Sequence, residues 1–149
     1  MESSRKPLTT VLAEAIAWLL AALFAYTAVS KVYDWQGTQR AMYNQVFPIA
    51  MADVLLYLLP LVELGVAVLL LVPGWRKIGL LMSVLLMVLF TGYVAWVWLG
   101  FSGRVPCSCG GVLENLGWGE HLVVNLMFLV LAVIGYWSHR KVRNGKSKL

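Results

Sequence analysis

The sequence predicts an all-α fold, a bundle of four transmembrane helices with both termini cytoplasmic and two loops facing outward. The chain of 149 residues is 60% hydrophobic and 13% charged, with a mean hydropathy of +0.77. A water-soluble domain of this size needs more polar surface than that. The apolar residues form four stretches, each near the roughly 17–25 residues that a helix needs to cross a bilayer core. We therefore expect one integral membrane domain over residues 1–149.

The four predicted spans cover residues of about 8–29, 54–72, 78–99 and 121–137, and a basic tail follows at 138–149. The first is not expected to be a cleavable signal, because it lacks an Ala-x-Ala-like exit and continues into Ser30 and Lys31. Pro73-Gly74-Trp75 is a short connection, which predicts an antiparallel hairpin of the second and third spans. Residues 31–53 mix aromatic and polar side chains, which indicates an amphipathic segment at the interface.

Basic residues predict the orientation of the spans. The N-terminus, the second connection and the tail hold nine of the twelve Lys and Arg, whereas the other two loops hold Lys31, Arg40 and Arg104. The positive-inside rule then places both termini in the cytoplasm and the loop of residues 101–119 outside. In a bacterial inner membrane that side is the periplasm, where disulfides form and persist.

The two cysteines of the chain lie in this outer loop, in the sequence Val105-Pro106-Cys107-Ser108-Cys109-Gly110-Gly111. Such a pair can form a disulfide, hold a soft metal or exchange electrons with a partner. Two residues of extended chain span about 7 Å at most, so a disulfide between them needs a bent and strained backbone. A strained, exposed disulfide suits exchange better than structural cross-linking. Free or inertly paired thiols are the alternative, and no further cysteine completes a tetrahedral zinc site.

Glu63 stands within the second predicted span, where a charge costs at least a few kcal/mol unless it is paired or neutralised. Its candidate partners are Lys31, Asn125 or a polar ligand, and a packing hydrogen bond between helices is the alternative role. Burial favours a protonated carboxyl, which Gln would imitate better than Leu or Asp; an ionised carboxyl would instead pair with a cation such as Lys31.

His121 opens the fourth predicted span, one helical turn before Asn125 and on the same face. A histidine there could act as the acid or base that activates a thiolate or protonates a leaving thiol. It could equally be an interfacial histidine that hydrogen-bonds to the loop.

Several short patterns occur in order along the chain: Ala28-Val29-Ser30-Lys31, Leu58-Leu59-Pro60-Leu61-Val62-Glu63-Leu64, the basic hairpin, Cys107-Ser108-Cys109-Gly110-Gly111, and Glu120-His121-Leu122-Val123-Val124-Asn125-Leu126. In this order they resemble the methylamine-utilisation MauE branch of the DoxX-like membrane proteins over nearly the whole chain. The resemblance implies a four-helix membrane protein linked to periplasmic thiol chemistry beside a thioredoxin-like protein. It also implies Cys107 and Cys109 as the redox pair, with Lys31, Glu63 and Asn125 as the polar positions.

The function expected from the sequence is thiol–disulfide exchange in the inner membrane, with Cys107, Cys109 and His121 as the catalytic candidates. The expected partners are the lipid bilayer and a periplasmic thioredoxin-like or disulfide-containing protein, not a nucleic acid. No cofactor is fixed by the sequence, although the four-helix vitamin K epoxide reductases suggest a quinone as electron acceptor by analogy. Two alternatives stay open: a non-catalytic assembly or scaffold subunit, and a small-solute or metal-handling protein that uses Glu63 and Lys31.

The predicted orientation can be tested with a thiol reagent that does not cross membranes. Applied to intact spheroplasts after mild reduction, the reagent should label Cys107 or Cys109, because the positive-inside rule places their loop outside. The measurement is the mass shift of the labelled protein on a gel. Labelling that requires permeabilised membranes would reverse the orientation.

Overall fold

The computed structural model describes residues 7–101 and 117–146, and the described residues are almost entirely helical. The helices are α1 (Leu8–Tyr33), α2 (Trp35–Tyr43), α3 (Ile49–Leu71), α4 (Arg76–Trp98) and α5 (Trp118–Lys146). Four stretches are long and apolar enough to span a membrane, namely α1, α3, α4 and Trp118–Val142 of α5. The prediction of an all-α fold with four membrane-spanning helices is confirmed.

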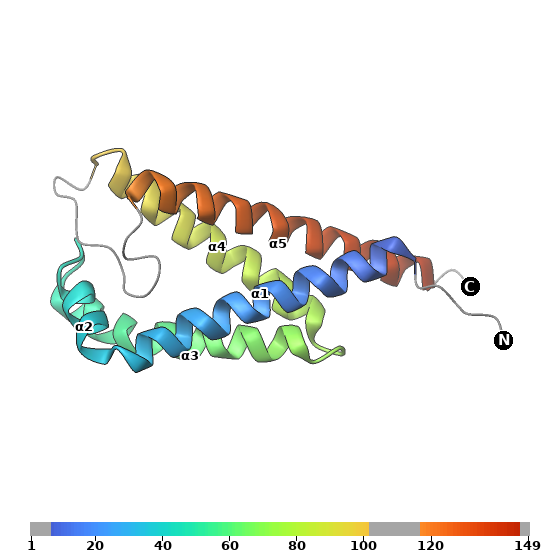
Figure 1. Cartoon of the computed structure of the whole chain (residues 1–149), viewed down its shortest axis with the longest axis horizontal. Helices are drawn as coiled ribbons and strands as arrows, with labels where there is room; N and C mark the ends of the chain where they lie inside the picture. The colour runs from blue at the N-terminus through green and yellow to red at the C-terminus, as the bar shows by residue number, and fades with distance from the viewer. Residues whose placement is uncertain (1–6, 102–116, 147–149) are drawn as a thin grey trace.

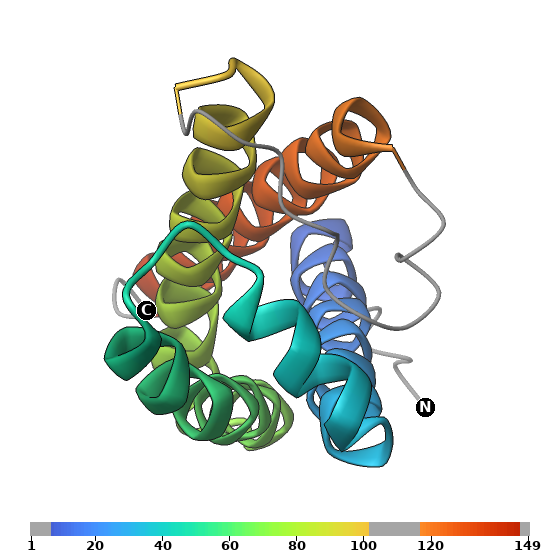
Figure 2. The ribbon, with the colours of Figure 1, turned by 90° about the vertical axis from the view of Figure 1, so that its left-hand side faces the viewer.

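The four long helices, seen from the side in Figure 1 and end-on in Figure 2, form a ring in the order α1, α3, α4, α5, in which each packs against its two neighbours. The short helix α2 lies across one end of this ring, against α1 and α3 (Figure 2). We call this the α2 end, and the opposite end, which holds the α3–α4 turn, the hairpin end. The start of α1 and the last turns of α5 lie at the hairpin end (Figure 1). The last turn of α4 and the first turn of α5, which flank residues 102–116, lie at the α2 end.

Each helix extends beyond its predicted span at one end or at both, because a helix continues past the hydrocarbon boundary until a residue ends it, whereas α3 and α4 end slightly earlier than predicted, at Leu71 and Trp98. Helix α1 continues to Tyr33 and is followed by the non-helical Asp34. Helix α3, which contains most of the second predicted span, begins at Ile49, directly after Pro48. The fourth span is part of a helix that begins at Trp118 and includes the basic tail as far as Lys146. Long basic side chains can reach water from such a helix end, so their charge does not stop the helix.

Helix α2 confirms the amphipathic segment expected from residues 31–53. Its buried side chains, Thr38 and Met42, lie one turn apart and face the bundle. The carboxylate of Asp34 caps its N-terminus by accepting a hydrogen bond from the Gly37 backbone N–H at 3.0 Å. A Cβ on residue 37 would lie 2.1 Å from the Asp34 carboxylate, so a larger residue there would displace this cap.

The turn between α3 and α4 is held by Arg76, whose side chain is buried. Its Nε donates a hydrogen bond to the Leu70 carbonyl oxygen at 3.1 Å, which satisfies one of the carbonyls left free at the end of α3. Its Nη1 lies 4.0 Å from Oε1 of Glu14 on α1. One side chain therefore connects the ends of three helices.

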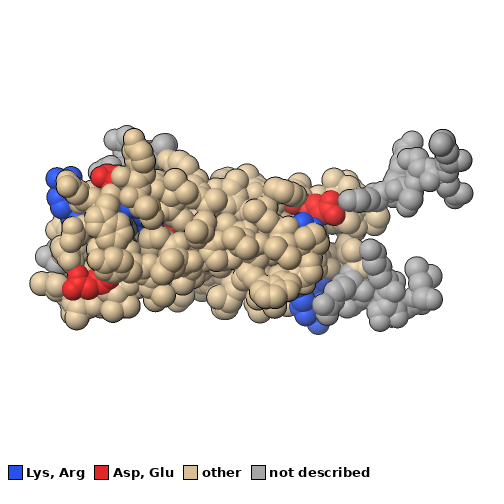
Figure 3. Space-filling view, turned by 90° about the horizontal axis from the view of Figure 1, so that it is seen from below, with Lys and Arg blue, Asp and Glu red and all other residues tan. Residues whose placement is uncertain are grey.

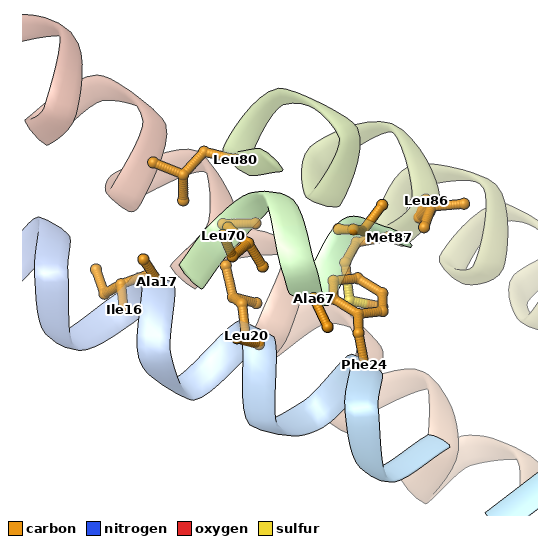
Figure 4. Close-up of a cluster of buried hydrophobic side chains, with 12 residues drawn as sticks. Ile16, Ala17, Leu20, Phe24, Ala67, Leu70, Leu80, Leu86 and Met87 are labelled. Carbon is orange, nitrogen blue, oxygen red and sulfur yellow. The ribbon is translucent and has the colours of Figure 1, made fainter. Parts of the chain in front are cut away.

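The hydrophobic core joins all four long helices. Its labelled members in Figure 4 are Ile16, Ala17, Leu20, Phe24, Ala67, Leu70, Leu80, Leu86 and Met87. On α5, Ala132 belongs to the same core, and Gly135 lets that helix approach α1, since a Cβ there would lie 2.7 Å from the Ile16 side chain. Small residues at helix contacts are typical of membrane bundles, in which close packing replaces the hydrophobic effect.

The face of the bundle seen in Figure 3 is apolar along its middle, and charged atoms gather toward the two ends. Many large apolar side chains on the outer helix faces are exposed, among them Leu61, Leu89 and Val123. An apolar band between two charged ends fits the hydrocarbon core of a bilayer. The bundle therefore presents to lipid the surface that the composition predicts.

Replacing Gly79 of α4 by Ala should destabilise the hairpin end. A Cβ there would lie 2.8 Å from the Leu70 backbone nitrogen, so α3 and α4 would have to move apart. We expect a loss of about 1–3 kcal/mol in unfolding free energy, as for other overpacked sites. The measurement is a denaturant titration of the protein in detergent micelles.

Gly92→Ala on the same helix is the matched control. Gly92 is exposed, and a Cβ there meets no atom within 4 Å. The control should be neutral or slightly stabilising, because Ala favours helix over Gly. Equal losses for the two variants would contradict the close packing at Gly79.

Candidate functional site

An ion pair lies inside the bundle, between α1 and α3. The Lys31 Nζ donates to both carboxylate oxygens of Glu63, at 2.8 Å and 2.9 Å. The Glu63 side chain is 2% exposed and that of Lys31 is 16% exposed. Two-oxygen contact with an ammonium at these distances is the geometry of two charged groups. Of the three partners considered for Glu63, the structure places Lys31 against it.

Helix geometry brings these two side chains together. Lys31 is in the last turn of α1, and its Nζ also lies 3.4 Å from the carbonyl oxygen of Thr27, one turn earlier. Glu63 follows the buried Pro60 by one turn of α3. A lysine stem is long enough for its ammonium to reach a partner some distance along the helix. The charge therefore lies within the bundle although Lys31 itself is near a helix end.

The ion pair forms part of the wall of a cavity with a volume of about 590 Å³. All five helices contribute to the wall, which is mostly apolar. Its aromatic members are Phe24, Tyr26, Phe47, Phe90, Tyr93, Trp118 and Phe128, and its methionines are Met42, Met51 and Met87. A cavity of this size, mostly apolar with a few polar groups, has the dimensions of a small-molecule binding site.

Two polar side chains of α5 line the same cavity, His121 and Asn125. Asn125 is 7% exposed, and its Nδ2 has no hydrogen-bond partner among the described residues. His121, one turn earlier, is partly buried and lies within range of an electrostatic interaction with the Lys31 ammonium. The cavity wall therefore carries an ion pair on one side and an unsatisfied amide donor on another.

Gln45 and Tyr93 close the cavity toward α2. The Tyr93 hydroxyl donates a hydrogen bond to Oε1 of Gln45, and the Gln45 amide donates to the Ala41 carbonyl oxygen at 3.0 Å. Gln45 is 1% exposed, and the ring of Phe47 packs 5.1 Å from that of Tyr93. The sequence analysis did not select either residue. The available signal was weak: one glutamine in an interfacial segment and one tyrosine in an apolar span.

The structure thus brings together four of the six residues selected from the sequence, Lys31, Glu63, His121 and Asn125. The other two, Cys107 and Cys109, lie outside the described residues. Within 7–101 and 117–146, no three His, Asp or Glu side chains gather in a way that could hold a metal ion.

Fold and site together define a multi-pass membrane protein of four spanning helices, with a charged pair and a cavity inside the bundle. A comparison with known families matches residues 9–138 to the family described as methylamine utilisation protein MauE. The chain belongs to this family. Searches of curated proteins and of solved structures found no match.

Replacing Glu63 by Gln should now be damaging, which differs from the expectation based on a protonated carboxyl. The amide would leave the Lys31 ammonium in the bundle without its counter-charge, and removal of one partner from a buried pair costs about 3–5 kcal/mol. Because Lys31 is partly exposed, we expect about 3 kcal/mol. The measurement is unfolding free energy in detergent, with assembled protein in membranes as a second readout.

The double variant Lys31→Met/Glu63→Gln should recover most of that loss, because neither charge remains. Asp53→Asn is the matched control, the same chemical change at an exposed position in the first turns of α3, and should cost less than about 1 kcal/mol. A Glu63→Gln variant as stable as the unmodified protein would show that the pair is not held by charge.

Proposed function

We propose that this protein takes part in thiol–disulfide exchange at the outer face of a bacterial inner membrane, through Cys107 and Cys109. The carrying observation is the C-x-C pair in the segment between α4 and α5. Both flanking helix ends lie at the α2 end, opposite the hairpin end (Figure 1), where Arg76 and Lys77 begin α4. With the positive-inside rule, this arrangement supports a periplasmic location for the thiols.

The proposed chemistry needs only a disulfide on one protein and a dithiol on the other. A thiolate of the partner attacks one sulfur of the Cys107–Cys109 disulfide, a mixed disulfide forms, and the released cysteine leaves as a thiolate that takes up a proton. The second thiol of the partner then attacks the mixed disulfide. The products are reduced Cys107 and Cys109 and an oxidised partner. The same steps run backward if the partner arrives oxidised.

A thioredoxin-like protein is the proposed partner, because it presents at an exposed site two cysteines that alternate between a dithiol and a disulfide. His121 supports the proposal by its position in the first turn of α5, at the end of the helix next to the cysteine segment. There it would supply or accept the proton of a leaving or attacking thiol. Lys31, Glu63 and Asn125 would act as supporting polar residues inside the bundle.

Replacing one cysteine by Ser should trap the partner. The remaining thiol has no resolving neighbour, so a mixed disulfide should accumulate as a high-mass band that disappears on reduction. Cys107→Ser and Cys109→Ser should differ in the amount of this band, since one sulfur receives the attack. The measurement is a non-reducing gel of membranes followed by identification of the trapped protein.

The double variant Cys107→Ser/Cys109→Ser should lose the band and the function while the four-helix bundle still assembles. Ser108→Ala, between the two cysteines, is the matched control and should keep both. Full function of the double variant would remove thiol exchange and leave a non-catalytic assembly subunit as the better account.

A further inference from the structure

The cavity at the α2 end is lined by a buried polar group, the Asn125 amide, that lacks a partner among the described residues. The Asn125 amide is more than nine-tenths buried, and its Nδ2 has no hydrogen-bond partner among the described residues. An unsatisfied buried donor costs about 1–3 kcal/mol. The amide lines a cavity of about 590 Å³, so a ligand inside that cavity could supply the missing acceptor. From this juxtaposition we propose that the cavity binds a lipid-soluble quinone, with a ring carbonyl accepting from Asn125.

Charge in the cavity wall favours an uncharged ligand. Lys31 is the cationic side chain among the described lining residues, and its ammonium already pairs with both carboxylate oxygens of Glu63. A fatty acid or an anionic headgroup would therefore enter an apolar cavity without a free counter-charge, which is strongly unfavourable. A carbonyl oxygen needs only a hydrogen-bond donor. The ligand that fits is neutral and carries an acceptor.

The shape and chemistry of the wall favour a flat ring over a flexible acyl chain. Aromatic side chains from three helices face the cavity, with Phe24 on α1, Phe90 on α4 and Phe128 on α5. Aromatic rings pack well against a flat conjugated ring in offset or tilted arrangements. Met42, Met51 and Met87 add unbranched side chains that adapt to an irregular outline. A quinone ring with an apolar tail meets all these conditions.

Binding can be measured with decylubiquinone and the full-length protein in lipid nanodiscs. Trp118 lines the cavity, so a bound quinone should quench tryptophan fluorescence in a saturable way. Trp118→Phe should reduce the amplitude of the quench, because it removes a fluorophore that lines the cavity. Asn125→Leu should weaken binding about fivefold to tenfold, the range that loss of one hydrogen bond predicts.

Two valines of α5 give a matched pair that locates the site. Val124 lines the cavity, whereas Val123 is 66% exposed on the outer face of the same helix. Val124→Trp should abolish the saturable quench by filling the cavity, and Val123→Trp should leave the dissociation constant unchanged. A quench that is unaffected by Val124→Trp, or equally affected by both variants, would overturn the proposal.

Solvent extraction of protein purified from membranes identifies the natural occupant. Recovery of quinone from the unmodified protein, and less of it from Val124→Trp, supports the proposal, whereas recovery of phospholipid or fatty acid alone overturns it. The proposed contacts with the quinone come from described lining residues and not from the thiols, so Cys107→Ser/Cys109→Ser should bind decylubiquinone normally. Failure of thiol exchange and failure of quinone binding are therefore separate results.

Discussion

The ion pair of Lys31 and Glu63 is the constraint on which the α2 end of this protein depends. Moving a charge out of water costs several kcal/mol per ion, so neither side chain is tolerated inside the bundle without the other. Their contact fixes the position of α1 along the bundle axis relative to α3, because an ammonium 2.8 Å from a carboxylate allows little movement of one helix along the other. Helix α2 begins just after Lys31, at Trp35, so its position follows from the same contact.

The two halves of the bundle follow different packing rules. Toward the hairpin end, glycines such as Gly79 and Gly135 bring backbones into close contact, and Arg76 joins three helix ends. Toward the α2 end, larger side chains surround an open volume, and Asn125 keeps an unsatisfied donor there. A tightly packed half stabilises the fold, which allows the other half to keep a cavity that lowers stability.

The sequence was sufficient for the fold and for part of the site. Hydropathy located four spans because a continuous apolar stretch of about 20 residues satisfies its own backbone hydrogen bonds in lipid as a helix. Glu63 was recognisable because a carboxyl in an apolar span needs a partner, but three partners fitted until the helix positions were known. Gln45 and Tyr93 were missed because their contact joins residues far apart in sequence. The cavity itself depends on packing between helices, which residue spacing does not encode.

The buried position of Arg76 affects how the basic residues of this chain are interpreted. It is one of the basic residues from which the orientation of the helices is predicted, yet its guanidinium is buried against the Leu70 carbonyl and near Glu14. Its neighbour Lys77 is only partly buried and is therefore more available to lipid phosphates or water. A basic residue at a membrane turn can thus serve two separate steps, first retention of the turn on one side during insertion and later closure of the folded bundle. Removing the charge of Arg76 would disturb both steps at once, whereas removing that of Lys77 would mainly disturb the first.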